Sequence, residues 1–159
     1  MGIQRHFNNT LSLTFPDGFH VMNNDERQKL KMLADGPGEC LTDPDRHIII
    51  SAGYKQAGSF TSFFFNEKDA ARSMEQQISK PMAAYGYRKL GSAERIVGGR
   101  GVHGFGYIYE SQGIAMYAES HVSKIGKTFY YIHYYTREAL KEENMPVWES
   151  FLNEIRWEG

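Results

Sequence analysis

The stretch 100–136 constrains the fold more than any other part of the chain. Three runs rich in aromatic and β-branched residues follow one another there, reading GVHGFGYIYE, IAMYAESHV and TFYYIHYYT. Ser111-Gln112-Gly113 separates the first two runs and Gly126 precedes the third, and residues of these types favour tight turns. The pattern predicts three long antiparallel strands, around which we expect the rest of the chain to pack.

The N-terminal residues predict a hairpin. In the stretch 10–15 Leu11, Leu13 and Phe15 alternate with polar residues, which is typical of a half-buried strand. A turn sequence, Pro16-Asp17-Gly18, follows, and the run 19–22 returns as a second strand.

Helices and strands alternate in the middle of the chain. Asn23 with Glu26 predicts the capped start of a helix that ends near residue 33, and 47–51 predicts a buried strand. Residues 42–45 predict a turn, and 60–65 fit either a short strand or an aromatic plug. Asn66 predicts the cap of a second helix that Pro81 interrupts and Gly86 ends, and 87–97 predicts a strand.

A last helix is predicted after the three-strand region. Asn144 is its expected N-cap, and Pro146 fits the first turn. Apolar residues recur at helical spacing and predict a face that docks on the sheet, at Trp148, Phe151, Leu152 and Ile155.

Length, charge and cysteine content limit the class of protein. A chain of 159 residues suits a single domain, 1–159. The net charge of −1 provides no basic field for nucleic acid or anionic lipid. The single Cys40 cannot form an internal disulfide, the N-terminus shows no apolar signal region, and no run is long enough to span a membrane. We therefore expect a soluble cytoplasmic protein without membrane insertion.

The element order, together with three segments, resembles the PsbP-like α/β/α sandwich group. The segments are LSLTFPDGF (11–19), GGRGVHGFGYIYESQG (98–113) followed by GKTFYYIHYYT, and the terminal VWESFLNEIRW. The group includes PsbP of photosystem II, a nuclear import factor that binds Ran, and bacterial DcrB-like proteins. The resemblance implies an α+β fold, with an antiparallel sheet of about six strands flanked by helices. A cystatin- or NTF2-like curved sheet is the alternative, although the helix after the three strands argues against it.

The three-strand region contains the candidate site residues. A hairpin centred on Gln112 would set His103 opposite His121, close enough for two imidazoles to share a metal ion. The alternative is that these histidines are polar tips of a mixed sheet face. The same register places a row of mostly aromatic side chains on one face: Phe105, Tyr107, Tyr109, Tyr117, Phe129, Tyr131, His133 and Tyr135. Such a face is either a wall that binds a ligand or partner, or core covered by a helix.

No catalytic signature is present in the sequence. The glycines at 98–106 lack the spacing of a phosphate-binding loop, and Cys40 has no nucleophile motif around it. We therefore expect a non-enzymatic binding or adaptor domain, without a cofactor, that contacts an unknown protein partner through an exposed aromatic–polar surface. A small-ligand or metal-binding domain that uses the Tyr/His face is the alternative, and an enzyme of an unrecognised kind is a third. Edge strands could also pair in a homodimer.

Overall fold

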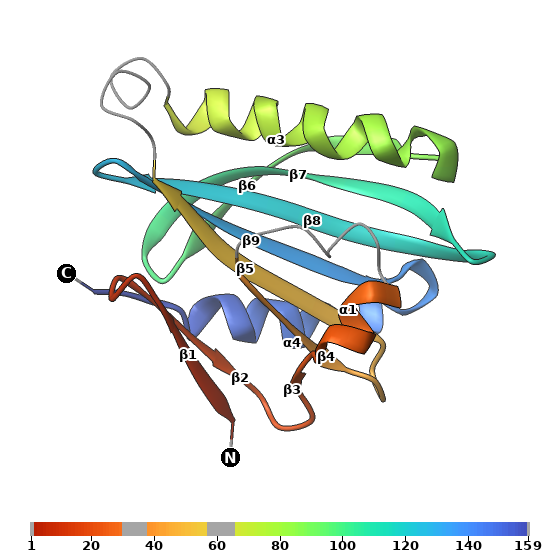
Figure 1. The fold of residues 1–159 in the computed structure, drawn as a ribbon, viewed down its shortest axis with the longest axis horizontal. Coiled ribbons are helices and arrows are strands. Elements are labelled where there is room, and N and C mark those ends of the chain that lie inside the picture. The colour runs from red at the N-terminus through yellow and green to blue at the C-terminus, as the bar shows by residue number, and fades with distance from the viewer. Residues whose placement is uncertain (1, 30–37, 57–65, 159) are drawn as a thin grey trace.

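Two antiparallel sheets and three helices make up the computed structural model, which describes residues 2–29, 38–56 and 66–158 (Figure 1). The large sheet has the order β3-β4-β5-β9-β8-β7-β6, and the small one has the order β1-β2-β10. The strands are β1 (Ile3–Phe7), β2 (Leu11–Phe15), β3 (His20–Val21), β4 (Glu39–Asp43), β5 (Ile48–Gln56), β6 (Arg88–Val97), β7 (Arg100–Ser111), β8 (Ile114–Ile125), β9 (Thr128–Arg137) and β10 (Arg156–Trp157). The helices are α1 (Asn24–Lys29), α3 (Glu67–Met82) and α4 (Lys141–Asn153), with 3-10 turns η2 (Ala83–Tyr85) and η3 (Glu138–Leu140). The expected α+β class is confirmed, with more strands than expected.

The predicted meander is the centre of the large sheet. Strands β7, β8 and β9 follow one another through two tight turns. Gln112 and Gly113 form the first turn with φ of 52° and 79°, and Gly126 has a φ of 61° in the second. Positive φ at both central residues in the first turn, and at the first central residue in the second, are geometries that match the twist of paired strands, which explains the short connections.

Helix α3 covers one face of the large sheet (Figure 1). Its predicted cap is confirmed, because Asn66 and Asp69 accept hydrogen bonds from each other's backbone N–H groups at 2.9 and 3.2 Å. Pro81 lies in the last turn, and Gly86 ends the helical region with a φ of 73°. The helix presents Ala70, Met74 and Met82 to the sheet, and these side chains are buried.

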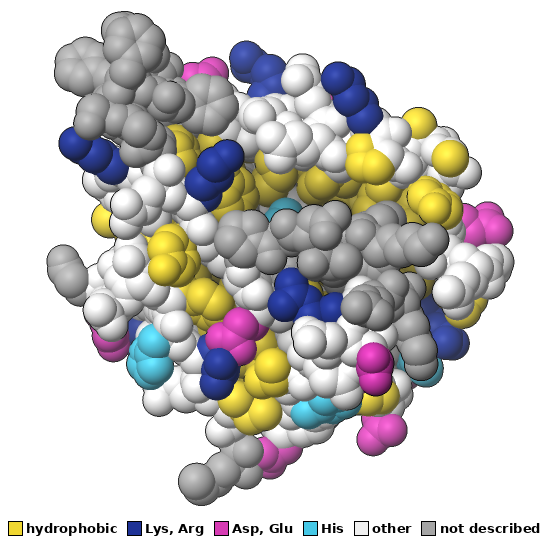
Figure 2. Space-filling view, viewed as in Figure 1, with side chains coloured by type: hydrophobic (Ala, Val, Ile, Leu, Met, Phe, Trp, Pro, Cys, Tyr) yellow, Lys and Arg dark blue, Asp and Glu magenta, His cyan; other side chains and the backbone are white. Residues whose placement is uncertain are grey.

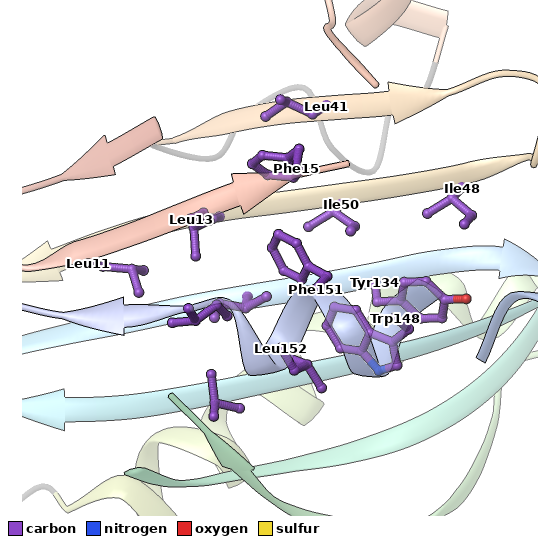
Figure 3. Close-up of a cluster of buried hydrophobic side chains, with 14 of the residues drawn as sticks. Leu11, Leu13, Phe15, Leu41, Ile48, Ile50, Tyr134, Trp148, Phe151 and Leu152 are labelled. Atoms are coloured by element: carbon purple, nitrogen blue, oxygen red, sulfur yellow. The ribbon is translucent and has the colours of Figure 1, made fainter. Parts of the chain in front are cut away.

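Helix α4 and the small sheet cover the other face (Figure 1). The predicted apolar stripe is confirmed for Trp148, Phe151 and Leu152, which are buried on α4. Ile155 is also buried, but it lies beyond the end of the helix at Asn153. Figure 3 shows Trp148 and Phe151 beside the side chains of β2, β5 and β9. The predicted cap at Asn144 is wrong. The helix begins at Lys141, and the buried Asn144 amide instead donates to the Arg46 carbonyl and the Thr136 hydroxyl, both at 2.9 Å.

The N-terminal hairpin forms from different partners than those predicted. Strand β2 pairs with β1 and β10, whereas β3 pairs with β4 in the large sheet. Asn8 and Asn9 both adopt positive φ, which asparagine tolerates, and they turn β1 into β2. Pro16-Asp17-Gly18 therefore carries the chain from one sheet to the other.

The segment between the N-terminal hairpin and α3 contains one strand more than predicted. The buried strand expected at 47–51 is confirmed as part of the longer β5, and β4 precedes it where only a turn was predicted. The capping box of α1 is confirmed by reciprocal bonds between Asn23 and Glu26, at 2.9 and 3.1 Å. The expected end of that helix and the aromatic run 60–65 lie outside the described residues.

Candidate functional site

The aromatic face of the meander is an interior surface. It lies under α3, and Figure 2 shows a band of hydrophobic side chains where that helix meets the sheet. Phe105, Tyr107, Tyr109 and Tyr135 are no more than 6% exposed. Tyr131 and His133 are half-buried at the same face. The sequence left two interpretations of this face open. The structure supports the one in which a helix covers the face.

Hydrogen bonds cross this face between buried and half-buried side chains. The Tyr107 and Ser120 hydroxyls lie 3.3 Å apart, and Ser120 Oγ lies 2.7 Å from His133 Nδ1. Burial, together with the nearby charge of His121, lowers the pKa of His133 to about 4. Burial also raises the pKa of Tyr107 to about 12. At neutral pH both groups are uncharged, so Tyr107, Ser120 and His133 form a neutral hydrogen-bonded chain within this face.

Tyr117 is the one predicted member of the aromatic face that lies elsewhere. It pairs with Ile108 and Thr136, and its side chain belongs to the core under α4. The residue of β8 that lies opposite His133 is Ser120. Each of the two turns contains two residues. The pairing of β8 with its neighbours is therefore shifted by an odd number of residues from the predicted register. An odd shift moves a side chain of β8, such as Tyr117, to the other face of the sheet.

The predicted histidine pair does not form. His103 lies opposite Val122, and His121 lies opposite Gly104, so the two imidazoles point to opposite faces of the sheet. His103 lies 3.8 Å from Glu94 and 4.0 Å from Glu67. Within the described ranges, no group of three or more His, Cys, Asp or Glu residues is arranged to hold a metal ion.

A charged cluster that the sequence did not reveal lies under α4. The Arg95 guanidinium donates to both oxygens of Glu119 at 2.6 and 2.8 Å, and the Tyr117 hydroxyl donates at 2.6 Å. His121 Nε2 lies 2.9 Å from the same carboxylate. Burial alone would raise the pKa of Glu119, but the hydrogen bonds from His121, Arg95 and Tyr117 outweigh it and hold that pKa well below its usual range. Glu119 is therefore a buried carboxylate with a full set of partners.

The glycines of β7 make room for this cluster. Gly104 and Gly106 lie on β7 between Arg95 on one side and β8 on the other. A methyl group at Gly104 would lie 2.0 Å from the Ser120 carbonyl oxygen and 2.5 Å from His121 Nδ1. Alternating glycines in a strand commonly allow a close approach of another segment or a bend of the strand. In the structure they let the side chains of Arg95 on β6 and Glu119 on β8 meet across β7.

The accessible candidate site is a pocket between α3 and the edge of the large sheet. Its volume is about 290 Å³. Two of the predicted site residues reach it, since His103 and Phe105 form part of its floor. Lysine, arginine and glutamate side chains make its rim, at Lys68, Arg72, Glu75, Lys89 and Glu94. Lys89 pairs with Glu75 at 3.1 Å across the pocket, so α3 and β6 are bridged by charge at one end.

Strand β6 forms the outer side of this pocket and is the edge of the large sheet. In the part of the chain that the structure describes, β6 pairs with β7 alone. Its Leu90 and Ile96 side chains are 47% and 68% exposed. An edge strand directs half of its backbone N–H and C=O groups away from the sheet, where another chain can pair with them. The sequence marked 87–97 as a strand, but the order of strands in the sheet could not be read from it.

Comparisons with known proteins find likeness in structure alone. No family model and no curated protein matches the chain. PsbP (CyanoP) from Synechocystis sp. PCC 6803 is similar with a TM-score of 0.71 at 9% identity, covering 98% of this chain and 92% of that one. LpqN of Mycobacterium tuberculosis, described as involved in cell envelope biogenesis, gives 0.61 at 12% identity, covering 100% and 91%. The Saccharomyces cerevisiae Ran-binding protein Mog1p gives 0.59 at 8% identity, covering 98% and 95%. At these identities the likeness lies in the fold.

Among the described residues, no helix combines the length and the apolar character needed to cross a bilayer.

Proposed function

This chain has the PsbP-like fold, and we propose that it is a non-enzymatic domain that binds another protein through the surface formed by β6 and α3. The observation that carries the proposal is that, among the described residues, no strand pairs with the outer edge of β6, a ten-residue strand beside the α3 pocket. Open edges of this length are sites where a second chain adds a strand. Mog1p is a Ran-binding protein, which agrees with a protein-binding role as an analogy of fold.

The chemistry of the surface also supports a protein partner. Ile96 and Leu90 provide apolar contact area, and the charged rim of the pocket provides polar contacts around it. Interfaces commonly combine an apolar centre with such a polar rim. The sequence led us to expect an aromatic–polar surface, and this proposal moves the contact from the buried tyrosines to the edge strand.

The alternative of a small-ligand domain built on the Tyr/His face has less support. That face is packed against α3, and Ser120 at its centre is 0% exposed. An enzymatic role for the Ser120–His133 pair has little support for the same reason, because a substrate would have to reach a buried hydroxyl. The single domain and the cytoplasmic location expected from the sequence remain parts of the proposal.

A pull-down with a matched pair of variants tests the proposal. Tagged protein is incubated with lysate of the organism that encodes it, and bound proteins are identified by mass spectrometry. We expect a stoichiometric partner on the wild type and on Ile114→Asp, and its loss on Ile96→Asp. Ile114 is a suitable control because it is also exposed, at 38%, but lies at the β7–β8 turn.

Two results would overturn the proposal. One is a column that retains no partner with the wild-type protein. The other is a partner that both variants retain equally, since the binding surface would then lie away from β6.

A further inference from the structure

We propose that the partner of the β6 edge is a second copy of this chain, paired antiparallel about a two-fold axis at Ser92. The inference rests on the proposed function, because it names the occupant of the same surface.

The side chains of β6 on the α3 face form a row that is nearly complementary to the same row running in the opposite direction. Lys89, Ser92 and Glu94 lie opposite Tyr107, Phe105 and His103, which are on that face. Ile96 follows on the same side. At the other end Tyr87 directly precedes β6, which begins at Arg88, and its ring lies 5.4 Å from that of Tyr107. In chain order the row is therefore Tyr87, Lys89, Ser92, Glu94 and Ile96.

Antiparallel pairing about Ser92 joins opposite partners in this row. Glu94 meets Lys89 of the partner subunit, and by symmetry the same ion pair forms again on the other side of the axis. Ile96 meets Tyr87 of the partner subunit, an apolar contact with an aromatic ring. Directly opposed side chains of opposite charge, and aromatic side chains beside β-branched ones, are pairs that stabilise antiparallel strands.

The bulge in β6 sets this register. The pairing of β6 with β7 shifts between Lys89 and Gly91, where Gly91 has a φ of 150°. A regular strand centred on Ser92 would place Leu90 opposite Glu94. Because the bulge absorbs one residue, Lys89 takes that position instead. On the opposite face Arg95 would approach Arg88 of the partner subunit, but Glu119 already neutralises Arg95.

The groups needed for pairing are available on the surface. The Glu94 side chain is 75% exposed, and its described ionic contact is His103 at 3.8 Å. The Lys89 side chain is 41% exposed and uses one side of its ammonium group on Glu75. An ammonium group has three protons, so Lys89 can contact a second carboxylate without losing the first.

The two edges of the sheet limit the assembly to a dimer. The edge opposite β6 is β3, which has two residues against the ten of β6. A head-to-tail contact between β6 and β3 would bury little and could extend into a filament. A β6–β6 contact uses the same surface on both subunits and therefore closes.

Sedimentation with exchanged charges tests the pairing. We expect the mass of the wild-type protein to rise with concentration from 18.2 kDa toward twice that value. Glu94→Lys and Lys89→Glu should each raise the dimer dissociation constant by at least about tenfold. An equimolar mixture of these two variants should restore the dimer, which also shows that both are folded. Glu110→Lys makes the same charge change outside the paired region and should leave the dimer unchanged.

A cysteine at the axis tests the register directly. In Ser92→Cys the two introduced thiols would face each other, so oxidation should yield a disulfide-linked dimer, whereas Ala115→Cys should not. The native Cys40 is buried and does not interfere. A wild-type chain that stays monomeric, or a dimer that Glu94→Lys and Lys89→Glu leave intact, overturns the inference. A monomer that still retains a different stoichiometric protein in the pull-down keeps the proposed function and discards this partner.

Discussion

Arg95 on the edge strand β6 reaches across β7 to hold Glu119 on β8 with two hydrogen bonds of 2.6 and 2.8 Å. The pair joins strands that are not neighbours in the sheet. Its carboxylate is 1% exposed, whereas the arginine side chain is 25% exposed. This contact fixes β6 to the sheet interior while leaving its outer edge open.

Glu119→Gln should destabilise the fold by about 2 to 4 kcal/mol, because it leaves a partly buried guanidinium without its counter-charge. Urea denaturation monitored by circular dichroism measures this cost. Glu110→Gln is the control, since Glu110 is exposed and its replacement should stay within about 0.5 kcal/mol of the wild type. Equal costs for the two variants would mean that the Glu119 cluster contributes no net stability.

Gly104→Ala should cost about 3 kcal/mol or more, because the added methyl group collides with the Ser120 carbonyl and the His121 ring. Gly101→Ala on the same strand meets no atom within 4 Å and should be neutral or slightly stabilising. Thermal and urea unfolding of the two variants side by side check this difference. A Gly104→Ala protein as stable as Gly101→Ala would show that β7 can move away from β8.

Stability should fall as the pH is lowered from 7 to 5, in part because of His133. Its pKa of about 4 in the folded protein lies below the ordinary value of about 6.5, so the unfolded chain takes up the proton first. The contribution of neutral His133 to the free energy of unfolding is complete above the unfolded-state pKa and is lost as the pH falls toward the folded-state pKa. The loss amounts to about 1 to 2 kcal/mol between pH 7 and pH 5. His133→Gln should show a shallower slope in unfolding experiments at several pH values. Identical slopes would place the pH dependence on the other histidines.

Cys40 should react slowly with thiol reagents in the native protein and quickly in urea. The residue is 3% exposed, and burial raises the pKa of its thiol, so both access and thiolate content are low. Ala115→Cys provides an exposed thiol in the same protein for comparison. Fast native labelling of Cys40 would indicate that β4 opens locally, because an opened strand exposes its thiol.

The contrast between prediction and structure is clearest at the histidines. The periodicity of the meander correctly grouped Tyr107 with Tyr135, because alternation along a strand depends only on neighbouring residues. Whether His103 faces His121 depends on whether the turn has two residues or three, and the two-residue turn at Gln112 and Gly113 separates them. A one-residue difference in a turn was therefore enough to invalidate the expected metal pair.

Local chemistry in the sequence determined the elements of this protein. Caps such as Asn66 with Asp69, the turn glycines and the apolar stripe from Trp148 depend on residues close together in the chain, so they can be read directly. The Arg95–Glu119 pair, the strand order that leaves β6 at an edge and the partners of β2 were decided only by the tertiary structure. These features join residues far apart in the chain, and no short-range spacing encodes which strands become neighbours or which charges are buried together.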